Sequence, residues 1–179
     1  ASRATALDLA CGTGHWTSIL YELDIDVVAV DSSGAMLRRA ELRLGEARSV
    51  EFVRVDAFEF LRRGNCYDYI VLGFWMSHVP RVLAESFLSL VAERSGLSGR
   101  IMVIDHLRAC DTFLDGTLPT EHESEVMHRT VKDGASFTIP KVFWSVDERQ
   151  QQFGALGLVA ETVFSGKRFF AISAARPDS

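Results

Sequence analysis

Short apolar runs alternate along the chain with longer segments whose apolar residues recur at helical spacing. The runs are too short for helices and rich in Val, Ile and Leu, which is typical of strands buried on both faces. Strands alternating with helices form βαβ units on a parallel sheet. The pattern therefore predicts an α/β domain with strands at about 5–10, 26–30, 50–55, 69–72 and 100–105.

Helix signals lie between these strands. Ser33 is a suitable N-cap for a helix that ends near Gly45. A longer helix covers about 82–94 and is expected to end at Gly96. Further helices are predicted around 16–23 and 58–63, and a capping box at 145–148 opens a last helix.

The alternation breaks after the fifth predicted strand. Residues from Cys110 to Gly134 are acidic and rich in turn formers, and two strand-like runs at 126–131 and 136–142 predict a hairpin. Apolar runs at 158–164 and 168–174 predict a closing antiparallel hairpin. We expect one domain over residues 1–179 with an inserted cap at about 110–143, preceded by a segment upstream of Ala1.

Composition limits the partners. With 47% hydrophobic and 24% charged residues, and no apolar run long enough to span a bilayer, we expect a cytoplasmic protein that does not enter membranes. A formal charge of -5 without a Lys/Arg cluster argues against nucleic acid. Three cysteines, Cys11, Cys66 and Cys110, form no CxxC pair, so we expect reduced, buried thiols.

Candidate chemistry gathers where the first three strands end. Asp8-Leu9-Ala10-Cys11-Gly12-Thr13-Gly14 closes the first strand and opens a helix, so a ligand could approach small residues and free N–H groups. Asp31 ends the second strand, where a carboxylate can accept hydrogen bonds from ribose hydroxyls, and Asp56 ends the third. The same residues also suit a tight turn and two helix caps, so both interpretations stay open.

These segments resemble the motifs of class I S-adenosylmethionine-dependent methyltransferases. The stretch 7–14 is similar to the first motif, Val30-Asp31 to the second, 55–58 to the third and 67–71 to the fourth. The resemblance runs to Ala174, although Ala10 stands where the family often has glycine. It implies a Rossmann-like, mostly parallel seven-stranded sheet with an antiparallel last strand and helices on both faces.

The resemblance also implies S-adenosylmethionine as the cofactor. The backbone around Ala10 to Gly14 would meet its methionyl moiety, Asp31 its ribose, and Asp56 with Ala57 its adenine. The cofactor residues expected on this basis are Asp8, Ala10, Cys11, Gly12, Gly14, Trp16, Asp31, Ser32, Met36, Asp56, Ala57, Phe58, Gly73 and Phe74.

The stretches 73–80 and 129–143 are similar to small natural-product O-methyltransferases of the phosphonate-methylating kind found in dehydrophos biosynthesis. This similarity predicts a small-molecule acceptor whose hydroxyl, carboxylate or phosphonate oxygen is methylated. His78 is the candidate catalytic base, because imidazole titrates near neutral pH. An oxyanion would need no base and would instead be bound by charge. The expected substrate-binding residues are Trp75, His78, Arg129, Lys141 and Arg168.

Other activities fit less well. Metal-dependent catechol-type methyltransferases have acids where this chain has Gly73-Phe74, and the HExxH pattern fails at His122-Glu123, so no metal is expected. An NAD-dependent oxidoreductase is disfavoured because Thr17 stands where the fingerprint has a third glycine. N-methylation of a small amine, a non-catalytic methyltransferase-like subunit, and a homodimer all remain open.

Overall fold

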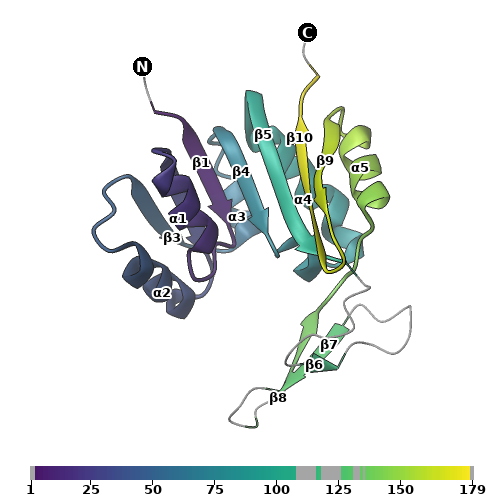
Figure 1. Cartoon of the computed structure of the whole chain (residues 1–179), viewed down its shortest axis with the longest axis horizontal. Helices are drawn as coiled ribbons and strands as arrows, with labels where there is room; N and C mark the ends of the chain where they lie inside the picture. Colours follow the sequence, from purple (N-terminus) through teal and green to yellow (C-terminus); the bar gives the residue numbers. More distant parts are fainter. Residues whose placement is uncertain (1–2, 108–115, 118–125, 131–133, 135, 178–179) are drawn as a thin grey trace.

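The computed structural model describes residues 3–107, 116–117, 126–130, 134 and 136–177 (Figure 1). At its centre is a seven-stranded sheet in the order β3-β2-β1-β4-β5-β10-β9. The first five strands run parallel, whereas β10 is antiparallel to both β5 and β9. The α/β sheet with a reversed last strand is thereby confirmed. Its strands are β1 (Thr5–Leu9), β2 (Asp26–Asp31), β3 (Val50–Arg54), β4 (Tyr67–Gly73), β5 (Ser95–His106), β9 (Val159–Ser165) and β10 (Phe169–Ala175).

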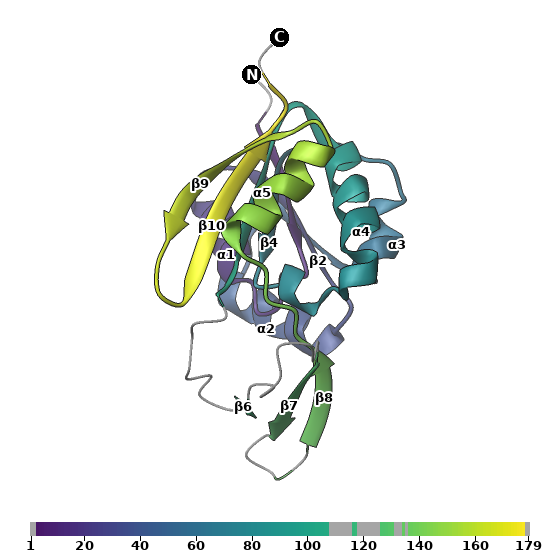
Figure 2. The same ribbon diagram turned by 90° about the vertical axis from the view of Figure 1, so that its right-hand side faces the viewer.

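Helices cover both faces of this sheet (Figures 1 and 2). Because side chains alternate along a strand, Leu7 and Leu9 of β1 belong to one core with Phe87 and Phe153, whereas Ala6 belongs to another with Leu20. The first core lies beneath α3, α4 and α5, and the second beneath α1. The helices are α1 (His15–Glu22), α2 (Gly34–Leu44), α3 (Ala57–Leu61), α4 (Arg81–Arg94) and α5 (Val146–Ala155), with the short 3-10 helix η1 (Met76–His78).

Two predicted helix starts are confirmed by their caps. The Met36 backbone N–H donates to Ser33 Oγ at the start of α2, which ends at Gly45 with a φ of 62°. Ser145 and Glu148 form the reciprocal capping box at the start of α5. These local hydrogen bonds satisfy backbone donors that have no partner inside the helix.

The predicted end of the long helix at Gly96 is wrong. Helix α4 ends at Arg94, and β5 begins at Ser95, so Gly96 lies inside the strand. The register between β4 and β5 shifts between Tyr67 and Tyr69. A Cβ on Gly99 would lie 2.9 Å from the Tyr67 carbonyl oxygen, so glycine permits the close backbone approach at this bulge.

The insertion forms a second, antiparallel sheet of β6 (Gly116–Thr117), β7 (Val126–Thr130) and β8 (Ser136–Pro140). Pairing of β7 with β8 confirms the predicted hairpin, whereas β6 was not predicted. Gly134 adopts a positive φ of 87° in the turn, and Lys132 and Asp133 lie outside the described residues. Figure 1 shows this small sheet beyond the carboxyl ends of the parallel strands.

Cysteine burial differs from the prediction at one position. Cys11 is buried as expected, but Cys66 is exposed because it lies in the loop before β4, and Cys110 lies outside the described residues. Among the helices that the structure describes, none is long and apolar enough to cross a membrane.

Candidate cofactor and substrate site

Asp31 connects two segments at the carboxyl ends of β1 and β2. The Gly12 N–H donates to its Oδ2 at 2.9 Å, and the Ser33 N–H donates to its Oδ1 at 2.8 Å. A carboxylate has about four acceptor positions, so each oxygen keeps capacity for a further donor. Asp31 therefore fixes the glycine turn and the start of α2 and can still accept ribose hydroxyls.

The turn after β1 depends on left-handed backbone conformations. Ala10 has a φ of 58°, Gly12 of 55° and Gly14 of 75°. The predicted strand therefore stops at Leu9 instead of Ala10, because this φ takes Ala10 out of the extended conformation. A Cβ on Gly14 would lie 2.8 Å from the Cβ of Ala40, so glycine lets α1 approach α2.

A small cavity of about 30 Å³ lies between the ends of β1, β2 and β3. Asp56 also caps α3 there, because its Oδ1 accepts hydrogen bonds from the Phe58 N–H at 2.9 Å and the Glu59 N–H at 3.2 Å. The structure thus brings together five predicted cofactor residues with one residue predicted to bind substrate. These lining residues are Ala10, Asp31, Ser32, Asp56 and Ala57, with Trp75.

Other predicted cofactor residues do not line this cavity. The Phe58 ring packs edge-to-face on Phe87 in the core, with ring centroids 4.8 Å apart. The Trp16 indole lies directly against Gly73, where any side chain would overlap it. Phe74 has a φ of 58° and its ring lies 4.7 Å from that of His106. Cys11 and Met36 belong to the segments that Asp31 holds, the glycine turn and the start of α2.

Asp8 lies beneath the glycine turn, with an exposed fraction of 1%. Thr17 Oγ1 donates to its Oδ2 at 2.5 Å, and its Oδ1 is buried without a hydrogen-bond partner. Burial raises the pKa of Asp8 to about 6 despite the opposing hydrogen bond from Thr17. The main role of the hydrogen bond between Thr17 and Asp8 is therefore to stabilise the glycine turn above it.

His78 lies at the end of η1, directly after β4, and its ring lies 6.3 Å from that of Trp75. Its Nδ1 is 2.9 Å from the Pro140 carbonyl oxygen. A carbonyl oxygen only accepts, so Nδ1 carries the proton and Nε2 of the neutral ring keeps its lone pair. Burial lowers the pKa of His78, and the positive charge of Lys141 lowers it further. Both effects favour the neutral imidazole.

Lys141 is buried beside this histidine, with an exposed fraction of only 3%. Its Nζ donates to Ser77 Oγ at 2.7 Å and lies 3.3 Å from His106 Nδ1. Sequence reasoning predicted Lys141 but missed Ser77, Asp105 and His106. Asp105 could have been found, because it is an acid at the carboxyl end of a strand, as are Asp31 and Asp56.

The two remaining predicted substrate residues are placed differently. Arg129 lies on β7, but its side chain lies outside the described residues. Arg168 is exposed in the β9–β10 turn, where its carbonyl oxygen accepts a hydrogen bond from the Leu107 N–H. Within the described ranges, no group of three or more His, Cys, Asp or Glu side chains could hold a metal ion.

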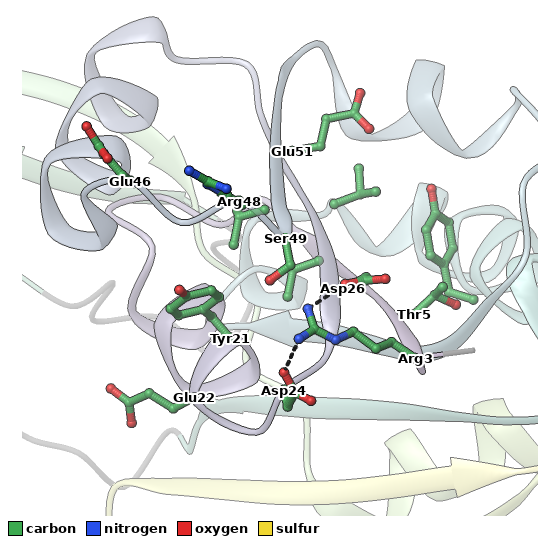
Figure 3. Close-up of a pocket in the computed structure, with 14 residues that line it drawn as sticks. Arg3, Thr5, Tyr21, Glu22, Asp24, Asp26, Glu46, Arg48, Ser49 and Glu51 are labelled. Carbon is green, nitrogen blue, oxygen red and sulfur yellow. Dashed lines mark hydrogen bonds and ion pairs between the residues drawn. The ribbon is translucent and has the colours of Figure 1, made fainter. Parts of the chain in front are cut away.

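A much larger cavity, of about 910 Å³, lies at the opposite end of the sheet, where the strands begin (Figure 3). Three of the side chains that line it are exposed and paired: Arg3 lies 2.6 Å from Asp24 and 3.5 Å from Asp26. This cavity contains none of the residues predicted to bind cofactor or substrate.

Comparison with known proteins identifies the family of this chain. Residues 6–94 match the family described as "Methyltransferase domain". The structure of DhpI in complex with SAM and HEP is 30% identical, with a TM-score of 0.82, and the alignment covers 98% of this chain and 79% of DhpI. Protein PH0226 from Pyrococcus horikoshii shares the fold at 19% identity and a TM-score of 0.74, over 98% of this chain and 83% of its own.

A curated relative matches over a shorter stretch. Demethylmenaquinone methyltransferase from Bacillus licheniformis is 35% identical over 83 residues, which are 45% of this chain but only 36% of that enzyme. The DhpI match is long and reaches 30% identity, and it agrees with the motif order and the reversed last strand. The chain therefore belongs to the class I S-adenosylmethionine-dependent methyltransferases and resembles DhpI.

Proposed function

We propose that this protein transfers the methyl group of S-adenosylmethionine to an oxygen atom of a small anionic metabolite. The observation that carries the proposal is the buried Lys141 ammonium group beside His78 and His106. A buried cation attracts an anionic acceptor and disfavours a protonated amine, because charge interactions are strong where water is excluded. The oxygen acceptor is thus favoured over the amine.

The cofactor would lie across the carboxyl ends of β1, β2 and β3. The turn from Ala10 to Gly14 would contact the methionyl part, Asp31 would accept from the ribose hydroxyls, and Asp56 with Ala57 would border the adenine. Trp75 was predicted to bind substrate, but it also borders the cofactor cavity from the turn after β4. Its ring would therefore lie near the adenosine as well as the acceptor. In this arrangement the sulfonium would lie toward β4, where His78 and Lys141 lie.

The chemical step needs positioning and, for a neutral hydroxyl, one base. The acceptor oxygen forms the new C–O bond as the methyl C–S bond breaks, and S-adenosylhomocysteine is released. His78 Nε2 takes the hydroxyl proton, which is consistent with the Nδ1–H tautomer fixed by Pro140. A carboxylate or phosphonate oxygen has no proton to lose, so His78 and Lys141 would then orient it.

Two relatives support different acceptors. DhpI was crystallised with SAM and HEP, and its match covers 98% of this chain, including the insertion that carries Arg129 and Lys141. The demethylmenaquinone methyltransferases match about a third of their own length, so their acceptor is a weaker guide. We therefore place the acceptor among small anionic metabolites, with Arg129, Lys141 and Arg168 as candidate binding residues.

An S-adenosylhomocysteine-release assay over phosphonates, carboxylates, phenols and amines tests the proposal. We expect turnover with anionic oxygen acceptors, and loss of about 10²-fold or more in kcat for a hydroxyl acceptor in His78→Ala with an unchanged cofactor Kd. Isothermal titration gives that Kd. Turnover confined to amines would refute the oxygen acceptor, and absence of S-adenosylmethionine binding to the folded protein would refute the activity itself.

A further inference from the structure

Every polar group of Ser77 is engaged, although the proposed reaction does not use this residue. Its N–H donates to Asp105 Oδ2 at 2.7 Å, and its carbonyl oxygen accepts from the Val142 N–H at 2.7 Å. Its Oγ accepts from Lys141 Nζ at 2.7 Å. With an exposed fraction of 1%, Ser77 is hydrogen-bonded to β5 on one side and to the segment that follows β8 on the other.

Asp105 anchors this arrangement from the end of β5. Its Oδ1 accepts from the His106 N–H at 2.8 Å, while its Oδ2 accepts from Ser77. Burial alone would raise the pKa of Asp105, but the hydrogen bonds from His106 and Ser77 and the charge of Lys141 hold that pKa below its ordinary value. Asp105 is therefore an ionised acceptor for the turn that follows β4.

Residues 140–142 are hydrogen-bonded to both Ser77 and His78 in the turn that follows β4. The Pro140 carbonyl oxygen accepts from His78 Nδ1, while Lys141 and Val142 bind Ser77 through side chain and backbone. Rotation of the His78 ring is thus limited by a chain segment whose position depends on Ser77. A neutral histidine side chain in water prefers the proton on Nε2, so the opposite tautomer here depends on the contact with Pro140.

We propose that Ser77 is a positioning residue for His78 through its hydroxyl group. The hydrogen bond from Lys141 to Ser77 Oγ, added to the backbone bonds of Ser77 with Asp105 and Val142, holds the Pro140 carbonyl oxygen against Nδ1 and keeps Nε2 as the proton acceptor. This inference rests on the proposed base role of His78. It assigns to a buried serine the control of which ring nitrogen accepts the proton, and it links the insertion to the base through three adjacent residues.

The charged groups around His78 come from three elements. Lys141 lies in the insertion directly after β8, Asp105 and His106 end β5, and all three act on the pKa of His78. Arg149 of α5 is fully buried near Asp105, and burial lowers its pKa to about 10. Since Ser77 binds Lys141, loss of its hydroxyl frees the ammonium group to shift and changes the balance of charge at His78.

The test compares Ser77→Ala with Ser86→Ala. Ser86 Oγ donates to the Leu83 carbonyl oxygen on the exposed side of α4, so its removal deletes a serine hydrogen bond away from the site. In ¹⁵N-histidine spectra we expect the Nδ1–H pattern of His78 in the wild type and in Ser86→Ala. In Ser77→Ala the pattern should shift toward Nε2–H, and kcat with a hydroxyl acceptor should fall about tenfold to a hundredfold.

Each outcome decides the proposal. An unchanged His78 tautomer in Ser77→Ala overturns it, as does a wild type without the Nδ1–H pattern. Lys141→Met removes the same hydrogen bond from the other partner, and should produce the same spectral change if the bond is what matters. If the spectra change as expected while His78→Ala keeps full activity, positioning by Ser77 stands and the base role of the proposed function fails.

Discussion

The two ends of the sheet use polar side chains in opposite ways. Where the strands begin, a cavity of about 910 Å³ is lined by residues that include the exposed ion pairs of Arg3 with Asp24 and Asp26. Where the strands end, the cavity between β1, β2 and β3 is only about 30 Å³, but Asp105 and Lys141 nearby are almost fully buried. Burying a charge is costly unless it is paired and hydrogen-bonded, and such buried groups cluster at functional sites, so they locate a site better than cavity volume does.

The largest expected difference between the two ends of the sheet is the effect of losing Asp31 on cofactor binding. Asp31→Ala removes the acceptor for the ribose and for the Gly12 and Ser33 N–H groups. We expect the S-adenosylmethionine Kd to rise by about a hundredfold or more, because hydrogen bonds to a charged group contribute about 1.5–3 kcal/mol each. The control Asp26→Ala removes an exposed partner of Arg3 where the strands begin. Equal S-adenosylmethionine Kd values for the two variants in isothermal titration would contradict this prediction.

The buried Asp8 should give the folded protein a distinct pH dependence. Its pKa is about 6 in the folded protein against an ordinary 3.8, so the folded state binds this proton more tightly. The contribution of Asp8 to the free energy of unfolding should be full below pH 4 and fall by about 3 kcal/mol in total as the pH rises through 6. Asp8→Asn should remove this fall. Urea denaturation of the cofactor-free protein at pH 5 and pH 8 would contradict the assignment if both proteins lost the same stability.

Two glycines should respond to alanine with opposite signs. Gly14→Ala places a Cβ 2.8 Å from that of Ala40 at a φ of 75°, and we expect about 2 kcal/mol of destabilisation. Gly154 lies in α5, and a Cβ added there would meet no atom within 4 Å, so Gly154→Ala should add about 0.5–1 kcal/mol. Thermal melting measures both, and equal shifts would disprove the packing argument for the turn.

The smallest effect is expected where the strands begin. Arg3 pairs with Asp24 and Asp26, whose side chains are 76% and 49% exposed. Exposed pairs contribute about 0–1 kcal/mol, so Arg3→Ala should hardly change the melting temperature or the cofactor Kd. A clear loss of cofactor binding in this variant would show that the large cavity takes part in function.

Much of the fold was predictable because its signals are local. Buried strands and the caps at Ser33 and Ser145 were identified from hydrophobic spacing and short motifs. The predicted strand at 100–105 is present as β5, but its early start at Ser95 was not predicted, because the close approach of Gly99 to Tyr67 is a tertiary contact without a sequence signal. Tertiary packing thus extended a strand through residues that suit a loop.

The site residues that follow directly from a predicted strand could be identified from the sequence. Asp31 ends β2, and Asp56 follows the end of β3 as the N-cap of α3, so their positions at the shared edge follow from topology alone. Ser77 and Lys141 are 64 positions apart, and only the path of the insertion brings them within 2.7 Å. The rings of Phe58 and Trp16, both predicted to bind cofactor, pack on Phe87 and against Gly73, and these packing contacts have no local sequence signal.

The anchoring of the insertion at Pro140, Lys141 and Val142 has a consequence for engineering. These residues hold the turn that carries His78, whereas β7 and β8 lie upstream of Lys141 in a separate small sheet. A chimaera that exchanges the segment between Leu107 and Pro140 would keep the whole anchor and replace the rest of the insertion. Acceptor preference could then be transplanted as a cassette while the methyl donor and its binding site stay the same.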